Sequence, residues 1–204
     1  MLLALGAAGL LAGVAQAQVV TVGGYAGSYA MRESTAGNHS GGLDLGISAA
    51  WHRRRLGARI DISRAHLSPA DSSRATFNVV EVDGRLSYRL SQAFDAELGV
   101  TRRTISPSFA TPDIGAVSLG VRSEARLASI AGVWARGAFL PIVRFNDGGS
   151  AGTSLEFGLG TWLLVRGATR AELDCEVHRF DRSVGGVALP VQTVVTRLGV
   201  QVPL

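Results

Sequence analysis

The chain has 204 residues, which is enough for one domain with a sizeable core or for one small barrel. Its formal net charge of +4 rests on arginine, because the sequence contains no lysine, and the arginines are scattered apart from the run Arg53-Arg54-Arg55. A nucleic-acid-binding protein gathers such charge on one face with interleaved aromatic residues. The pattern therefore argues against nucleic acid as a partner and favours solubility or contact with lipid phosphates. The single cysteine, Cys175, excludes an intramolecular disulfide.

The N-terminal segment has the pattern of a secretory signal peptide. Met1 to Gly13 contains no charged side chain and is mostly Leu, Ala and Gly, and the small-x-small sequence Ala15-Gln16-Ala17 follows it. This apolar run is shorter than the roughly 20 residues that a membrane-spanning helix needs. We expect a signal peptide over residues 1–17 and one outer-membrane β-barrel domain over residues 18–204.

From residue 18 onward, apolar and polar residues alternate with a period of two, which is typical of β-strands with one apolar face. In the clearest stretch, Leu173 and Val177 alternate with Glu172, Asp174 and Glu176. The alternation predicts about ten strands. They are expected near residues 19–31, 41–53, 55–66, 76–89, 93–106, 115–125, 128–145, 153–166, 169–180 and 191–204.

The connections between these strands alternate in length. Long polar connections are expected near residues 32–40, 67–75, 107–114, 146–152 and 181–190. Short ones are expected at His52 to Arg55, Leu90 to Gln92, Arg126 to Leu127 and Gly167 to Ala168. This rhythm predicts an all-β fold, an antiparallel up-and-down transmembrane β-barrel with short periplasmic turns, longer extracellular loops and both termini periplasmic. A soluble β-sandwich is the alternative fold.

Eight strands are the alternative to ten. The weakest predicted strand pair, the sixth and seventh strands, lies between Gly115 and Asn146. The alternation is poor there, and Pro141 interrupts an apolar run. Proline cannot donate to a strand ladder, so this hairpin is the one that an eight-stranded barrel would lose.

The non-apolar face of the strands carries charges of both signs. In a barrel of eight to ten strands the interior is narrow and is mostly filled by side chains, so these charges are expected to pair with one another or with trapped water. A narrow pore is the alternative, although wide aqueous channels need many more strands. The residues of this face are Asp44, Arg59, Asp61, Glu81, Asp83, Arg85, Glu97, Arg122, Glu124, Arg136, Glu156, Arg170, Glu172, Asp174, Glu176 and Arg197.

Three aromatic residues lie beside the predicted short turns, at the alternate strand positions that carry apolar residues (the apolar or lipid parity, as opposed to the lumen parity). They are Trp51, Tyr88 and Phe94. Outer-membrane barrels carry girdles of aromatic side chains where the wall meets the membrane interface. We expect these three residues to belong to the periplasmic girdle.

The export signal, the alternating segments and the loop asymmetry together resemble the small OmpA-like and OmpX-like transmembrane barrels of bacterial outer membranes. Such barrels commonly end in an aromatic residue that assists assembly, whereas this chain ends in Pro203 and Leu204. The resemblance implies an outer-membrane location and a monomer. It also implies outer-membrane lipid, lipopolysaccharide and the outer-membrane assembly machinery as partners.

Three of the four histidines, His39, His66 and His178, are expected near the extracellular end. His66 and Ser68 lie on the lipid parity and are similar to the His-x-Ser arrangement of the outer-membrane lipid A deacylases, in which histidine activates a serine nucleophile. The orienting acid is missing from this pattern. Glu81 lies on the lumen parity, and Asp71 is a substitute in the adjoining loop.

The outer-membrane proteases give a second comparison, because they use acidic pairs and an Asp-His pair at the barrel rim. Here His178, Asp174 and Asp181 are the residues that could be neighbours. Neither comparison provides a complete set of groups, and no metal-ligand spacing or phosphate loop is present. We therefore expect no catalytic, cofactor-binding or metal-binding residues and no cofactor. The expected function is that of a structural or surface-interaction protein, with a deacylase-like hydrolase and a narrow pore as alternatives.

Overall fold

The computed structural model describes residues 19–33, 38–71, 73–107 and 113–204. The predicted signal peptide, residues 1–17, lies outside these ranges. Among the described residues, no helix is long and apolar enough to cross a membrane.

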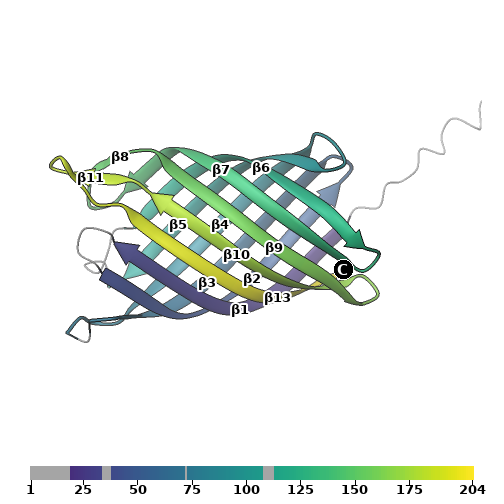
Figure 1. Ribbon diagram of the computed structural model, residues 1–204, viewed down its shortest axis with the longest axis horizontal. Coiled ribbons are helices and arrows are strands. Elements are labelled where there is room, and N and C mark those ends of the chain that lie inside the picture. Colours follow the sequence, from purple (N-terminus) through teal and green to yellow (C-terminus); the bar gives the residue numbers. More distant parts are fainter. Residues whose placement is uncertain (1–18, 34–37, 72, 108–112) are drawn as a thin grey trace, which may run out of the picture.

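Ten antiparallel strands close into one barrel, which Figure 1 shows from the side. The first strand pairs with both the second and the last, so every strand has two neighbours and the barrel has no free edge. The prediction of ten strands is confirmed, and the eight-stranded and β-sandwich alternatives are wrong. The barrel strands are β1 (Val19–Glu33), β2 (Asn38–Arg53), β3 (Leu56–Pro69), β4 (Phe77–Arg89), β5 (Phe94–Ser106), β6 (Ile114–Ala128), β7 (Ala131–Phe145), β9 (Ser154–Arg166), β10 (Thr169–Phe180) and β13 (Val191–Pro203).

The two ends of the barrel differ in how their strands are joined. One end, here called the turn end, carries both ends of the barrel chain and the connections at residues 54–55, 90–93, 129–130 and 167–168. The other end, the loop end, carries the longer connections, as predicted, with one exception: β1 and β2 are joined by residues 34–37 alone, because both strands extend into the connection predicted near 32–40. The turn predicted at Arg126 to Leu127 is wrong by three residues. A register shift between Arg126 and Ala128 extends the β6–β7 hairpin to residues 129–130.

Pro141 is accommodated by a second register shift in the same strand pair. Val117 lies opposite Ile142 and Leu119 lies opposite Phe139, so one residue of β6 faces two of β7. Such a bulge leaves one residue out of the ladder, and the missing N–H of proline then costs little. The hairpin that looked weakest in the sequence therefore remains in the barrel.

Three short strands that the sequence pattern did not indicate extend the loop end. β8 (Ser150–Ala151), β11 (Arg182–Val184) and β12 (Val187–Ala188) form a separate small sheet. Arg182 ties it to the neighbouring loop, since its guanidinium lies 2.6 Å from the Asp147 carboxylate and donates to the Gly148 carbonyl. The β11–β12 turn is Gly185-Gly186, whose φ values of 57° and 82° fit glycine.

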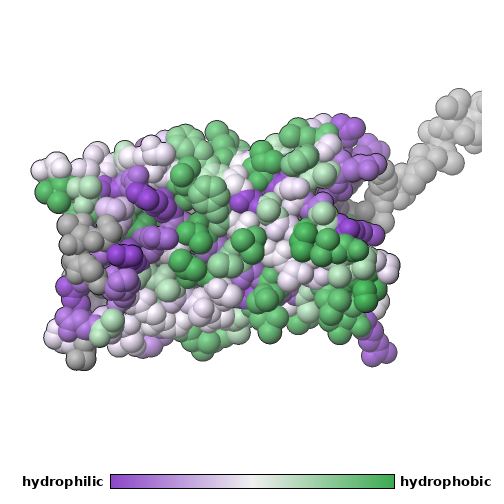
Figure 2. All heavy atoms as spheres, in the orientation of Figure 1, coloured by the Kyte–Doolittle hydropathy of each residue, from purple (hydrophilic) through white to green (hydrophobic). Residues whose placement is uncertain are grey.

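The outer wall is apolar, as the alternation predicted. Exposed leucine, isoleucine, valine and phenylalanine side chains cover the wall, and Figure 2 shows them between ends that are richer in hydrophilic residues. Tyr88 and Phe94 are 45% and 50% exposed on this surface beside the 90–93 turn, and Trp51 is half-buried near the 54–55 turn. Their positions agree with a girdle at the turn end.

Candidate functional site

Side chains that point into the barrel form three layers along its axis. β4 shows the sequence of layers on one strand. Phe77 and Val79 lie toward the loop end, Glu81 and Arg85 lie in the middle, and Arg89 lies at the turn end. The alternation of the strand decides which residues enter the lumen, and their chemistry along the strand decides what each layer is made of.

An apolar cap fills the loop end of the lumen. Its central side chains, Tyr29, Leu67, Phe180 and Val195, are at most 1% exposed. They come from four different strands and pack as one cluster. The other members of the cap are Met31, Ala65, Phe77, Val79, Ile105, Ile114, Ala116, Leu140 and Val191.

Beneath the cap lies an ionic layer of paired charges, which consists of Asp44, Glu81, Asp83, Arg85, Arg103, Arg136, Glu156, Glu176, His178 and Arg197. Arg103 joins the two layers. Its guanidinium donates to Glu81 at 2.6 and 2.8 Å and lies over the rings of Tyr29 and Phe180. It is fully buried, and both hydrogen bonds reach the same Glu81 oxygen, Oε2, so this charge-assisted contact offsets the loss of hydration of both charges.

Two further arginines connect distant strands across the lumen. Arg85 contacts Glu156 and Glu176, each at 3.2 Å, and Arg136 contacts both Glu97 and Glu156. Arg197 donates to Asp44 at 2.8 Å and lies 3.6 Å from Glu176, so it belongs to the same network. All 16 charged residues predicted for the lumen parity are buried or half-buried, so the predicted acid–arginine interior is confirmed. Arg103 also faces the lumen, although it was not among the 16 predicted residues.

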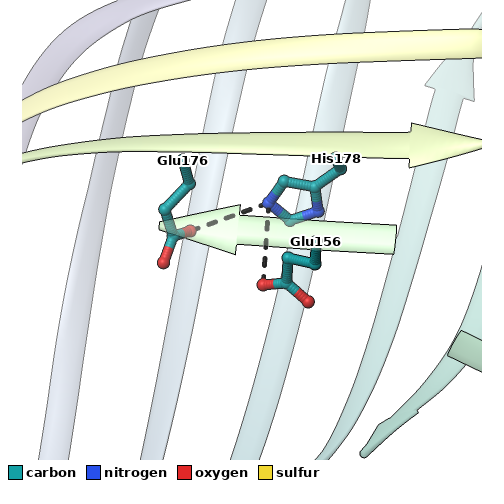
Figure 3. A group of neighbouring side chains, drawn as sticks. All are labelled: Glu156, Glu176 and His178. Carbon is teal, nitrogen blue, oxygen red and sulfur yellow. Dashed lines mark ion pairs between the residues drawn. The ribbon is translucent and has the colours of Figure 1, made fainter. Parts of the chain in front are cut away.

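Glu156, Glu176 and His178 form the group most similar to a metal site among the described residues (Figure 3). Their ligand atoms lie within 4.8 Å of one another, and His178 Nε2 is 3.7 Å from Glu176 and 3.8 Å from Glu156. However, guanidinium groups of Arg85 and Arg136 already contact these carboxylates. Because a cation would have to displace them, we assign the group to the ionic layer and not to a metal centre.

Below the ionic layer, the turn end contains a cavity of about 520 Å³, here called the turn-end cavity. Residues at the turn-end portions of most barrel strands line it. Arg85 of the ionic layer also belongs to its lining. Trp162 and Arg170 form one part of the wall, with the guanidinium 4.3 Å from the indole ring centre. Arg122, another lining residue, lies equally close to the ring of Trp134. Both lumen tryptophans stand at strand positions that are otherwise mostly polar, so the apolar–polar alternation does not reveal them.

The predicted His66–Ser68 pair lies on the lipid face, and both side chains are exposed. Neither candidate acid reaches the histidine. Glu81 is inside the barrel with Arg103, and Asp71 accepts a hydrogen bond from the Ser73 amide. The neighbour of His66 is instead Asn78, directly opposite on β4, with 3.2 Å between His66 Nδ1 and Asn78 Oδ1.

The second predicted constellation does not form. His178 is buried next to Glu156 and Glu176, whereas Asp181 pairs with Arg179 at 3.0 Å near the loop end. The predicted neighbours Asp174 and Asp181 are therefore not the groups that contact His178. Period-two parity places His178 in the lumen, but it does not give the cross-strand neighbours.

No protein-family model matches the chain, and no curated protein is similar to it in sequence. Solved structures do resemble it. The outer membrane protease OmpT from Escherichia coli has a TM-score of 0.53 and 10% identity, with 92% of this chain and 96% of that chain covered. The COG4313 outer membrane channel from Pseudomonas putida F1 has a TM-score of 0.54 and 12% identity, with 91% and 96% covered. The chain therefore has the fold of the outer-membrane β-barrels, as the sequence predicted.

Proposed function

We propose that the protein is a non-conducting, non-enzymatic integral outer-membrane barrel whose loop end is a contact surface. The apolar cap carries this proposal, because Tyr29, Leu67, Phe180 and Val195 pack as one cluster across the lumen and are at most 1% exposed to water. A conducting barrel keeps a continuous aqueous lumen, which requires more strands or a less crowded interior. The fold alone does not decide between these functions, since a protease and a channel share it.

Conductance across planar bilayers tests the closed lumen. The purified barrel should insert without discrete current steps, while a general porin reconstituted in parallel gives them. A shift in gel mobility on heating should show that the inserted protein is folded, because closed barrels resist detergent until they are heated. Regular steps from the folded barrel would contradict the proposal.

The small sheet at the loop end supports a role in surface contact. Val184 and Val187 are 38% and 54% exposed beside the Gly185-Gly186 turn, and Arg182 holds this hairpin to the neighbouring loop. An ordered projection with apolar side chains needs little further ordering when it binds.

Site-specific photocross-linking in intact cells tests this surface. A benzophenone side chain at Val187 should give a discrete adduct with a surface protein or polysaccharide. The same group at Leu159, which is 64% exposed in the middle of the apolar wall, should not. Absence of any adduct from Val187, with the barrel folded, would argue against a contact role.

Lipopolysaccharide is the lipid partner that we propose, because outward-facing arginines gather near the loop end. Arg102 and Arg144 flank Gly115 on adjacent strands, so two guanidinium groups border a position without a side chain. Arg32 and Arg179 flank Gln192 in the same way. Such pairs suit the phosphates of a lipid headgroup.

Co-purification measures this contact. The double variant R102Q/R144Q should retain less lipopolysaccharide than the wild type after detergent extraction. The variant R166Q, which removes an exposed arginine at the turn end, should retain as much as the wild type. Equal retention by all three proteins would remove the support for specific headgroup binding.

A lipid A deacylase-like hydrolase is the second candidate, favoured by the 3.2 Å contact between His66 and Asn78 on the lipid face. A neutral amide can orient a catalytic histidine, as the Cys-His-Asn proteases show. Mass spectra of lipid A from cells that express the wild type, H66A, S68A or N78A decide between the candidates. We expect identical spectra. Acyl-chain release that only the wild type performs would establish the hydrolase.

A further inference from the structure

The turn-end cavity has more positive than negative groups. Among the described residues, eight arginines and four acidic residues line it. In the ionic layer above, by contrast, every arginine contacts at least one carboxylate at 3.2 Å or less. The surplus of positive charge in the lumen is therefore concentrated at one end.

The arginines of the cavity are neutralised unequally: Arg59 pairs with Asp61 at 2.8 Å and Arg89 with Asp95 at 3.1 Å, whereas the pairs of Arg122 and Arg170 are longer. Arg122 and Arg170 share one carboxylate, Glu124, at 3.6 and 3.7 Å, which is longer than a direct hydrogen bond. Glu172 accepts from Trp134 Nε1 and Gln201 Nε2, so its two oxygens are already engaged. Arg126 has no side-chain partner within the described ranges.

Stacking prepares two of these arginines to bind an anion. Arg122 lies over Trp134 and Arg170 lies over Trp162, each 4.3 Å from the ring centre. A guanidinium stacked on an aromatic face keeps its N–H edge free and loses less freedom when it forms hydrogen bonds. In the same wall, Trp162 Nε1 is buried without a partner in the described part of the chain, so donors outnumber acceptors here.

We propose that the turn-end cavity binds a small anion with two or more acidic groups, held mainly by Arg122 and Arg170. The volume of about 520 Å³ lies within the range of small-molecule sites. Phosphates and carboxylates both match two converging guanidinium groups. Glu124, which already lies between the two arginines, shows that a group of carboxylate size fits there and is the internal competitor of the ligand.

Calorimetric titration at constant ionic strength tests the proposal, with the protein purified from membranes in a zwitterionic detergent. Pyrophosphate and citrate serve as probes, and the tighter of the two assigns the ligand to phosphates or to carboxylates. R122Q/R170Q should lower the affinity at least tenfold. R74Q, with one exposed arginine removed at the loop end, should leave it unchanged.

Tryptophan fluorescence provides a second measurement, because the two arginines stack on tryptophan rings whose emission can report a bound anion. The chain has three tryptophans, and W51F removes the one on the outer wall, so that emission then reports Trp134 and Trp162. Saturable quenching by the tighter probe in W51F is the expected result. If neither probe binds saturably, or if R74Q weakens binding as much as R122Q/R170Q, the proposal is overturned.

Discussion

The two ends of the lumen are built from the same ten strands and the same parity, yet they are opposite in character. At the loop end, aliphatic and aromatic side chains exclude water, and the ionic layer beneath them has its charges paired. At the turn end, arginines surround a cavity and most of them lack a close carboxylate. The period of two fixes which side chains point into the barrel. Whether a given part of the lumen is closed or filled with water depends on the types of residue at that depth along the barrel axis.

Substitutions at Arg103 and Arg102 should give the largest difference in the free energy of unfolding, because these neighbours face opposite sides of the barrel wall. Arg103→Ala leaves Glu81 buried without its guanidinium partner and should lower the free energy of unfolding by about 3–5 kcal/mol. Arg102→Ala removes an exposed side chain and should cost no more than about 0.5 kcal/mol. Urea unfolding in lipid vesicles measures both. Equal effects would mean that the ionic layer is hydrated and not closed.

Gly160 tests how the lower lumen makes room for its aromatic rings. A Cβ at this position would lie 2.6 Å from Trp134 Nε1 and 2.9 Å from the Leu173 carbonyl oxygen, so Gly160→Ala must displace the ring that donates to Glu172. We expect a loss of about 1–3 kcal/mol.

Gly137→Ala is the matched control for Gly160→Ala. The nearest atoms to a Cβ at Gly137 belong to Phe157 at 3.9 Å, which is an ordinary contact. The control should be neutral, and both variants can be compared in the same urea titration. A stable Gly160→Ala variant would show that the ring of Trp134 is loosely held.

Arg54 provides the smallest expected effect. Its φ of 56° lies in the left-handed region, which a residue with a Cβ adopts at a cost. Arg54→Gly should therefore raise the free energy of unfolding by up to about 1 kcal/mol. Arg53→Gly, within strand β2, should lower it. If both substitutions destabilise the barrel, the turn is not strained at Arg54.

The sequence predicts the barrel well because a period of two is a local signal. Strand count, loop asymmetry and lumen parity all follow from it, as the positions of Asp44, Glu81 and Arg197 show. Strands of two or three residues carry no such period, which is why β8, β11 and β12 were not anticipated. The shifted β6–β7 turn was missed because a bulge adds a residue without a distinctive residue type.

The interior contacts are not contained in that local signal. Barrel closure brings Arg197 against Asp44 and Arg85 against Glu176, residues that are far apart in the sequence. Parity shows that such charges share the lumen, but only the curvature of the closed sheet determines which of them meet. The turn-end cavity depends in addition on where Trp134 and Trp162 place their rings, and strand alternation gives no information on that.

Thiol accessibility tests the central claim of a lumen closed at the loop end and open at the turn end. In a Cys175→Ser background, which has no other cysteine, Ser87→Cys places a thiol in the lining of the turn-end cavity and Val195→Cys places one in the apolar cap. A charged, membrane-impermeant thiol reagent should modify the first rapidly in the folded, detergent-solubilised barrel. It should modify the second only after heat unfolding. Rapid modification of the thiol at position 195 in the folded barrel would contradict the closed lumen and favour a pore.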